Sequence, residues 1–212
     1  MNLKALTTTL NHYQKNILPV YNHCNATNIG TELQKTNTML SFINENTTCL
    51  SRSCLKGHFT GSAFVLHPER SMVALTLHAK LNQWLQLGGH ADNEKELHRV
   101  AMKEAQEESG MIHLHHIPFC LNRQPNSNLI LPFDIDIHLI PTYKDTPQHL
   151  HFDLRYLLIS FQTNLIKNHE SLFLKWFLIP EMQYQSFNNS LMRQVYKFNF
   201  LYKNKLLNIP SP

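Results

Sequence analysis

Three glutamates near the middle of the chain have a spacing that suggests chemistry. Glu104, Glu107 and Glu108 stand at positions i, i+3 and i+4, so in a helix they share one face. Like charges this close repel one another, and a helix C-terminus adds negative potential. Carboxylate oxygens are preferred ligands of hard cations such as Mg²⁺ or Mn²⁺. The spacing indicates a metal site, with a solvated acidic face as the alternative.

The surrounding pattern favours the metal site. Residues 94–109 contain neither Gly nor Pro, Asp92 or Asn93 can cap the start of a helix, and Gly110 can end it. One side of this predicted helix begins with apolar residues and continues into the three glutamates, whereas basic residues lie opposite. The apolar residues are Leu97, Val100 and Ala101, and the basic ones are Lys95, Arg99 and Lys103. A buried stripe that ends in carboxylates is typical of a site rather than of a solvated face.

Strands that would support such a helix are predicted both before and after it in the sequence. Residues 58–65 and 72–75 read as a hairpin, residues 132–140 and 149–157 alternate strictly, and residues 173–179 suggest a further strand. The two alternating strands each have one apolar and one polar side. The polar sides carry Asp134, Asp136 and His138 on the first strand and His149, His151, Asp153 and Arg155 on the second. Either the sheet has one wet face, or these side chains line a cleft.

Helical patterns occur at both ends of the chain. Apolar residues recur at three and four positions between Leu3 and Ile17, which predicts a helix ending before Pro19. A second helix would place Leu33, Leu40 and Ile43 inward, and a closing helix follows residue 190. This mixed order favours an α/β (α+β) sandwich, with a mixed β-sheet between helices and an N-terminal helical extension.

Composition narrows the class of protein. With 212 residues, 42% of them hydrophobic, the chain suits one main domain plus a modest extension. No apolar run reaches membrane length and no secretory signal opens the chain, so we expect a cytoplasmic protein without a membrane partner. The net charge of +4 is dispersed, so no obligatory nucleic-acid partner is implied. The four cysteines are expected to be reduced, and the pair Cys49 and Cys54 is the weak exception to this expectation.

Residues 88–111 resemble the Nudix box, Gly-x5-Glu-x7-Arg-Glu-U-x-Glu-Glu-x-Gly-U, where U is a bulky aliphatic residue. The matching residues are Gly89, Glu104, Glu107, Glu108, Gly110 and Met111, with Ala105 as a small residue at the first U. Lys95 replaces the first glutamate and Lys103 replaces the arginine. The stretches 57–63, 84–92, 133–138 and 149–156 also look like a bacterial Nudix subgroup with an N-terminal helical lead. We therefore predict a helical extension over 1–56 and a Nudix hydrolase domain with its C-terminal helix over 57–212.

The resemblance implies a metal-dependent pyrophosphohydrolase, which uses Mg²⁺ or Mn²⁺ and an activated water to cleave a nucleoside diphosphate linked to another group. By the same resemblance, Glu104, Glu107 and Glu108 would hold the metals, with the Gly88 carbonyl as an additional ligand. The general base would be Glu104 or Asp153, with Asp136 as the third candidate. The sequence does not identify the substrate.

Substrate contacts are open to two interpretations at each position. Lys80 and Arg155 are candidates for phosphate binding or for ordinary salt bridges. His90, His138 and His151 are candidates for hydrogen bonds to phosphate or for structural packing.

Lys95 and Lys103 motivate an alternative function. Lys103 can pair with Glu107 but lacks the two-pronged geometry of arginine, so the alternative is a catalytically weak or inactive nucleotide sensor with the Nudix fold. The N-terminal helices would either cover the sheet or pair two subunits in a homodimer.

Overall fold

A computed structural model describes residues 3–25, 27–79, 81–120, 130–169 and 171–210. Its strands form one mixed sheet, in which β3, β2, β1, β7 and β5 are neighbours in that order. In addition, β4 pairs with β1, β6 with β7 and β8 with β2. The strands are β1 Gly57–Leu66, β2 Met72–His78, β3 Gln83–Leu85, β4 Leu87–His90, β5 Leu114–His116, β6 Asp134–Ile140, β7 His149–Ser160 and β8 Ser171–Leu178.

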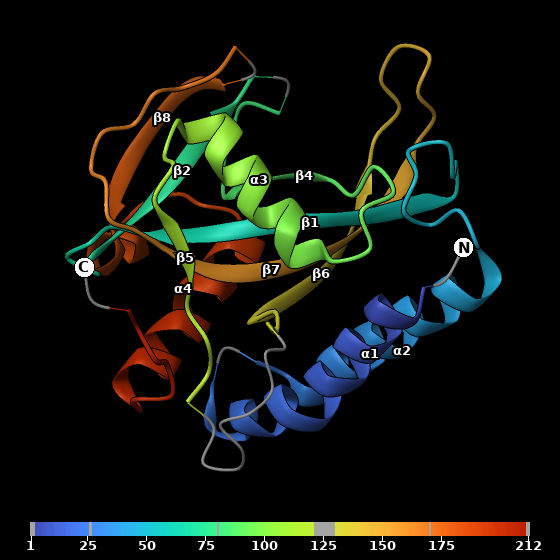
Figure 1. Cartoon of the computed structure of the whole chain (residues 1–212), viewed down its shortest axis with the longest axis horizontal. Helices are drawn as coiled ribbons and strands as arrows, with labels where there is room; N and C mark the ends of the chain where they lie inside the picture. The colour runs from blue at the N-terminus through green and yellow to red at the C-terminus, as the bar shows by residue number, and fades with distance from the viewer. Residues whose placement is uncertain (1–2, 26, 80, 121–129, 170, 211–212) are drawn as a thin grey trace.

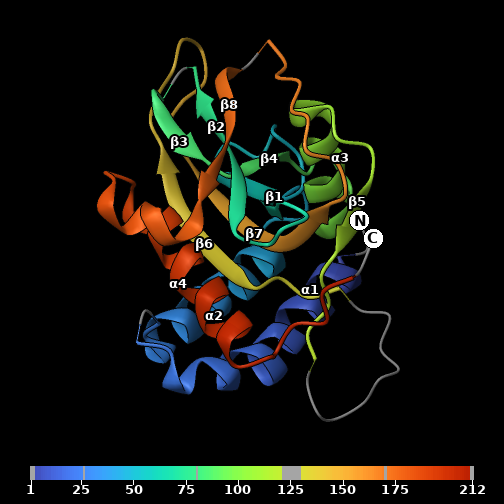
Figure 2. The ribbon, with the colours of Figure 1, turned by 90° about the vertical axis from the view of Figure 1, so that its left-hand side faces the viewer.

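Helices cover both faces of this sheet (Figures 1 and 2). One face of β1 carries α3, the other carries α4, and α1 and α2 lie along the edge that ends in β6 (Figure 2). The α-helices are α1 Lys4–His12, α2 Ile29–Glu45, α3 Leu97–Ser109 and α4 Asn189–Lys203. The predicted sandwich with a mixed sheet and an N-terminal helical extension is confirmed.

Polar side chains of the three neighbouring strands β1, β7 and β6 lie in rows across the sheet. Strand β1 runs parallel to β7, and β6 runs antiparallel to β7 on its other side. Their register puts His58, His151 and His138 in one row. The next rows on the same face are Thr60, Asp153 and Asp136, then Ser62, Arg155 and Asp134. Because side chains alternate along a strand, the polar sides predicted for β6 and β7 form one continuous surface.

The N-terminal helix follows the expected pattern as far as Ile17. After His12 it continues as a π-helical segment, Tyr13–Ile17, and a 3-10 segment, Leu18–His23, which contains Pro19. The inner face of α2 differs from the expectation, because Leu33 is 37% exposed while Glu32 is only 2% exposed. Glu32 turns inward because the buried ammonium of Lys197 lies 2.7 Å from its carboxylate.

The hydrophobic core is continuous from the N-terminal helices into the sheet. Phe42 of α2 stacks on Phe152 of β7 with ring centroids 4.2 Å apart. Tyr21 donates a hydrogen bond of 2.6 Å to the carbonyl oxygen of Phe133. The division at residue 56 stays a prediction, and these contacts tie the two proposed parts into one packed body.

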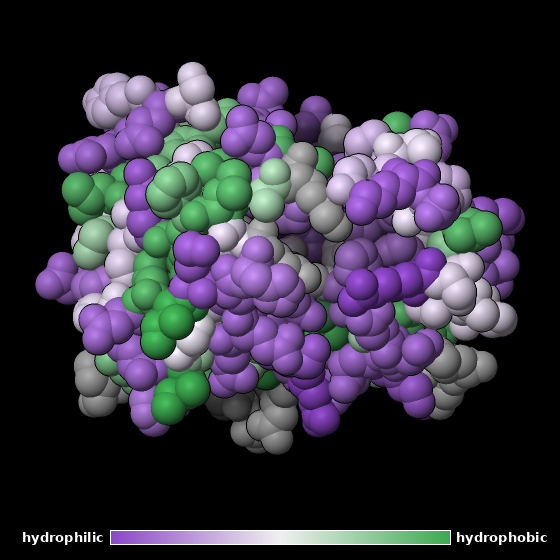
Figure 3. Space-filling view, turned by 90° about the horizontal axis from the view of Figure 1, so that it is seen from above, coloured by the Kyte–Doolittle hydropathy of each residue, from purple (hydrophilic) through white to green (hydrophobic). Residues whose placement is uncertain are grey.

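The surface, the helices and the cysteines add three observations. Seen from above, hydrophobic side chains gather on the side where β8 lies in Figure 1, while hydrophilic side chains dominate elsewhere (Figure 3). Among the helices of the described ranges, none combines the length and the apolar character that a membrane crossing requires. Cys24, Cys49, Cys54 and Cys120 are present as free thiols.

Candidate active site

Helix α3 is shorter than the predicted span of residues 94–109. It begins at Leu97, because Asp92 and Asn93 adopt left-handed backbone conformations with φ of 45° and 73°. Glu94 instead accepts hydrogen bonds from the backbone N–H groups of Lys95 and Glu96, at 2.7 and 3.0 Å. The predicted C-terminus is confirmed, since Gly110 ends the helix with φ of 70°. The apolar start of the helix is buried against β1, which orients the glutamates that follow.

Glu104 lies directly against the double glycine of β4. A Cβ on Gly89 would collide with the carboxylate group of Glu104. Only glycine lets the strand backbone and this side chain approach so closely. Burial raises the pKa of Glu104, while the charge of Lys103, 3.7 Å away, acts in the opposite direction.

Glu108 is held by the neighbouring glycine. The backbone N–H of Gly88 donates to its carboxylate at 3.0 Å, and the side chain is 8% exposed. A Cβ on Gly88 would lie 2.5 Å from Ser62 Oγ and 2.7 Å from Ser62 Cα, so this position also requires glycine. Glu107 is the outermost of the three, with its side chain 55% exposed. The three carboxylates thus share one end of α3, at the edge of β4.

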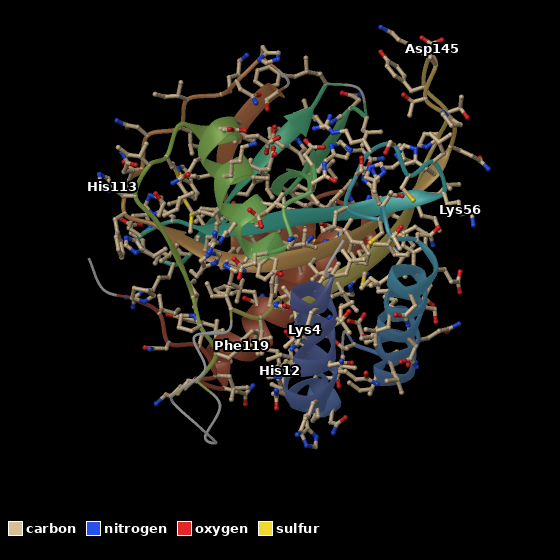
Figure 4. The ribbon with its side chains drawn as sticks, turned by 45° about the vertical axis from the view of Figure 1, so that its right-hand side comes forward. Lys4, His12, Lys56, His113, Phe119 and Asp145 are labelled. Carbon is tan, nitrogen blue, oxygen red and sulfur yellow. The ribbon has the colours of Figure 1, made fainter. Side chains whose placement is uncertain are left out.

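A pocket of about 600 Å³ opens beside these residues. Its lining includes Gly88, Gly89 and Glu108, and also Thr60, Ser62 and Asp153 from the neighbouring strands β1 and β7. The loop between β6 and β7 adds Asp145 and its neighbours to the lining, and this loop stands out from the body in Figure 4. The predicted residues His90, His138 and His151 also line the pocket. Lys80, a predicted phosphate ligand, lies outside the described residues.

Burial depresses the basicity of the histidines around this pocket. It lowers the pKa of His90 to about 4, with the charges of Arg52 and His58 adding to the effect. Burial also lowers the pKa of His151 to about 2 and that of His58 below its ordinary value. These imidazoles are therefore neutral at pH 7, and can donate or accept hydrogen bonds or bind a metal.

Arg155 lies in a buried ionic network rather than facing the pocket. Its guanidinium bonds to Asp153 at 2.8 Å, Asp134 at 2.9 Å and Asp136 at 3.1 Å. The residue is 2% exposed and its donors face three carboxylates, so it forms salt bridges and is not placed to bind phosphate. Its role is to hold three carboxylates in place, one of which lines the pocket.

Two candidate bases are members of this network. Asp153 also accepts hydrogen bonds from Thr60 at 2.9 Å and Ser62 at 2.8 Å. Burial alone would raise the pKa of Asp136, but the His138 imidazole, 3.5 Å away, and the charge of Arg155 hold it below its usual range. Asp153 lines the pocket and stays a candidate, whereas Asp136 lies one strand further away.

Comparisons with known proteins were made on the sequence and on the fold. No family model matches the sequence, and neither does any curated protein. A Nudix family hydrolase from Clostridium perfringens has a similar structure, with 25% identity, a TM-score of 0.51, and coverage of 68% of this chain and 97% of that one. The Nudix hydrolase RenU from M. smegmatis matches 72% of this chain and 90% of its own, with 12% identity and a TM-score of 0.49.

The chain has the fold of the Nudix hydrolases. Within this fold the substituted box positions have separate surroundings. Lys103 pairs with Glu107 at 3.2 Å, as the i, i+4 spacing predicts. Lys95 is exposed in the segment that precedes α3.

Several residues that support the candidate site were missed by sequence reasoning. From α4, Arg193 and Lys197 reach Asp134 at 2.9 and 2.6 Å, and Ser190 donates to Asp136 at 2.9 Å. The available signal was an arginine and a lysine four residues apart on a predicted helix. Their partners could not be identified because they are far away in sequence; Lys197 and Asp134, for example, are 63 residues apart. Arg52, which lines the pocket and pairs with Asp92 at 2.6 Å, was also missed.

Proposed function

We propose that this protein is a metal-dependent pyrophosphohydrolase that cleaves the diphosphate linkage of a nucleoside diphosphate joined to another group. The observation that carries the proposal is the position of Glu104 against Gly89 and of Glu108 on the Gly88 N–H, both beside the pocket. This arrangement supports a role for carboxylates at the position where the Nudix box would hold a cation.

The residues present fit a hard divalent cation. Three carboxylates are gathered at one helix end, and the side chain missing from Gly89 leaves the space that the carboxylate of Glu104 fills. Oxygen ligands of this kind suit Mg²⁺ or Mn²⁺. We propose Glu104, Glu107, Glu108 and the carbonyl of Gly88 as its ligands. When bound, such a cation neutralises phosphate charge and lowers the pKa of water.

The chain itself would position the substrate and accept a proton. We propose Glu104 or Asp153 as the general base, because both carboxylates lie at or beside the pocket wall. His90, His138 and His151 would donate hydrogen bonds to phosphate oxygens. We propose Mg²⁺ or Mn²⁺ as the cofactor and the cytoplasm as the location.

The test is hydrolysis of a panel of nucleoside diphosphate derivatives with Mg²⁺ and with Mn²⁺. Replacing Glu107 and Glu108 with Gln should lower kcat/KM by about 10²-fold or more, since the ligand set loses two charges. Glu96→Gln is the matched control, because Glu96 precedes the same helix and pairs with Arg99 at 2.7 Å. An inert wild type across a broad panel, or full activity in the double variant, would refute the proposal.

A second function, nucleotide sensing without turnover, is favoured by one observation. The ammonium of Lys103 lies 3.2 Å from Glu107 and 3.7 Å from Glu104, so it competes with a cation for these carboxylates. Calorimetry with nucleoside diphosphate derivatives in the presence of metal separates the two functions. Binding without product formation would favour the sensor.

A further inference from the structure

Five histidine rings gather where β1 and β7 begin, and all of them come from strands rather than from α3. His58 and His151 face each other across the parallel pair, and His138 lies opposite His151 on β6. The ring centroid of His58 lies 5.0 Å from that of His90, 4.9 Å from that of His149 and 4.8 Å from that of His151. Figure 4 labels Lys56, two residues before His58, at this end of the sheet. Such a concentration of imidazoles has no role in the proposed hydrolysis beyond single contacts to phosphate.

His149 has the tautomer that metal binding requires. Its Nδ1 lies 2.8 Å from the carbonyl oxygen of Pro147 and must donate a proton to it. Its Nε2 therefore carries a lone pair, which points at Nε2 of His151 at 3.2 Å. A backbone carbonyl that orients a ring in this way is the usual support of a metal-bound histidine.

His58 is buried without compensation for its polar atoms. It is 4% exposed, and although the backbone of Cys54 lies near the ring, neither ring nitrogen makes a hydrogen bond of normal geometry within the described ranges. A buried polar atom without a partner costs stability, so such a ring indicates a missing partner. A cation bound between this ring and its neighbours would provide one.

We propose that His58, His149 and His151 bind a divalent transition metal of the zinc class, at a second site separate from the carboxylates of the Nudix box. One ring nitrogen from each of the three lies within 4.8 Å of the other two. Tetrahedral zinc with Zn–N bonds of about 2.0–2.1 Å needs nitrogens about 3.3–3.4 Å apart. The Nε2 atoms of His149 and His151 are already 3.2 Å apart, whereas the His58 nitrogen, within 4.8 Å of both ligand atoms, would have to move closer on metal binding.

The chemistry of the ligands selects the metal. Neutral imidazole suits zinc, copper, nickel and cobalt, whereas Mg²⁺ and Mn²⁺ prefer carboxylate and carbonyl oxygen. Three protein ligands leave one coordination position open. All three histidines line the pocket, so the open position would take water or an anionic oxygen of the pocket's occupant.

The experiment measures zinc binding by the full chain without a histidine tag, in the presence of excess Mg²⁺. Dialysis followed by elemental analysis should find one Zn²⁺ per chain, and Co²⁺ should give the absorption bands of a four-coordinate site. His149→Gln and His151→Gln should each weaken zinc binding by at least about 100-fold. If His149→Gln fails to fold by circular dichroism, His151→Gln decides, because that ring is only half-buried.

Two control variants make the result specific. His98→Gln combined with His116→Gln removes another pair of histidines, with centroids 5.5 Å apart, and should leave zinc binding unchanged. Glu107→Gln combined with Glu108→Gln should also leave it unchanged, which separates this site from the proposed hydrolytic one. Absence of stoichiometric zinc in the wild type, survival of binding in both histidine variants, or its loss in the glutamate variant would overturn the proposal.

Discussion

The carboxylate of Glu104 occupies the space that a side chain on Gly89 would fill. The contact joins the end of α3 to strand β4, so the position of the carboxylate depends on a missing Cβ. A methyl group there would displace only the flexible end of the Glu104 side chain. The adjacent Gly88 differs, because a Cβ there would meet Cα of Ser62 at 2.7 Å.

We therefore expect Gly89→Ala to impair activity while the protein stays folded. Displacing a catalytic group by about 1 Å can cost about 10²-fold in rate, and kcat/KM should fall by that order. Gly88→Ala should instead lower the free energy of unfolding, because backbone must move. Gly30→Ala serves as control, since its Cβ would meet only Asn28 Oδ1 at 3.3 Å. Normal activity in a folded Gly89→Ala variant would contradict the assigned role of Glu104.

Arg155→Lys should destabilise the protein rather than weaken substrate binding. Lysine keeps the charge but cannot bond to Asp134, Asp136 and Asp153 at once. The free energy of unfolding should fall on the order of 3 kcal/mol, measured by urea denaturation. A raised KM with unchanged stability would instead restore the phosphate-binding interpretation.

Lys197→Met should show how strongly the N-terminal helices are tied to the sheet. The ammonium lies 2.7 Å from Glu32 and 2.6 Å from Asp134, and all three residues are 2% exposed or less. Removing this ammonium takes one cation from the buried carboxylates of Glu32 and Asp134, which keep Lys35, Arg155 and Arg193 as partners, at a cost of about 3 kcal/mol.

Two comparisons check this result by chemical denaturation. Glu32→Gln added to Lys197→Met should cost less than the sum of the single changes, because the two side chains interact directly. Lys203→Met, on the exposed last turn of the same helix, should change the free energy of unfolding by less than about 0.5 kcal/mol. Additive effects of the first pair would argue against the buried contact.

His116→Phe should reduce the loss of stability in mild acid. Burial, together with the charge of His98, lowers the pKa of His116 from 6.5 to about 4. The unfolded chain therefore binds a proton more readily, so this contribution is complete above pH 6.5 and is lost as pH falls toward 4. Within that window the slope of stability against pH should decrease by up to about 1.4 kcal/mol per pH unit.

The control for this change is His113→Phe, an exposed histidine labelled in Figure 4. For the His113→Phe variant, the slope of the free energy of unfolding against pH should match that of the wild type. At pH 7 the His116→Phe variant should be as stable as the wild type or more so, since Nδ1 of His116 is buried without a hydrogen-bond partner in the described structure. An unchanged slope would show that His116 titrates normally.

Local spacing was enough to predict the parts of this protein that depend on neighbours in sequence. The three glutamates share a helix face, Gly110 ends that helix, and β6 and β7 alternate as their residues indicate. These features follow from the periods of helix and strand, which the sequence displays directly.

Only the tertiary structure decided which charges meet. From the sequence, Arg155 was a candidate either for phosphate binding or for an ordinary salt bridge. The register of the sheet places it beside Asp134 and Asp136, which decides for the salt bridges. Likewise, Glu32 turned inward only because Lys197 from the opposite end of the chain lies beside it. Long-range pairing of this kind leaves no periodic trace, because its energy depends on separation in space and on burial rather than on spacing along the chain.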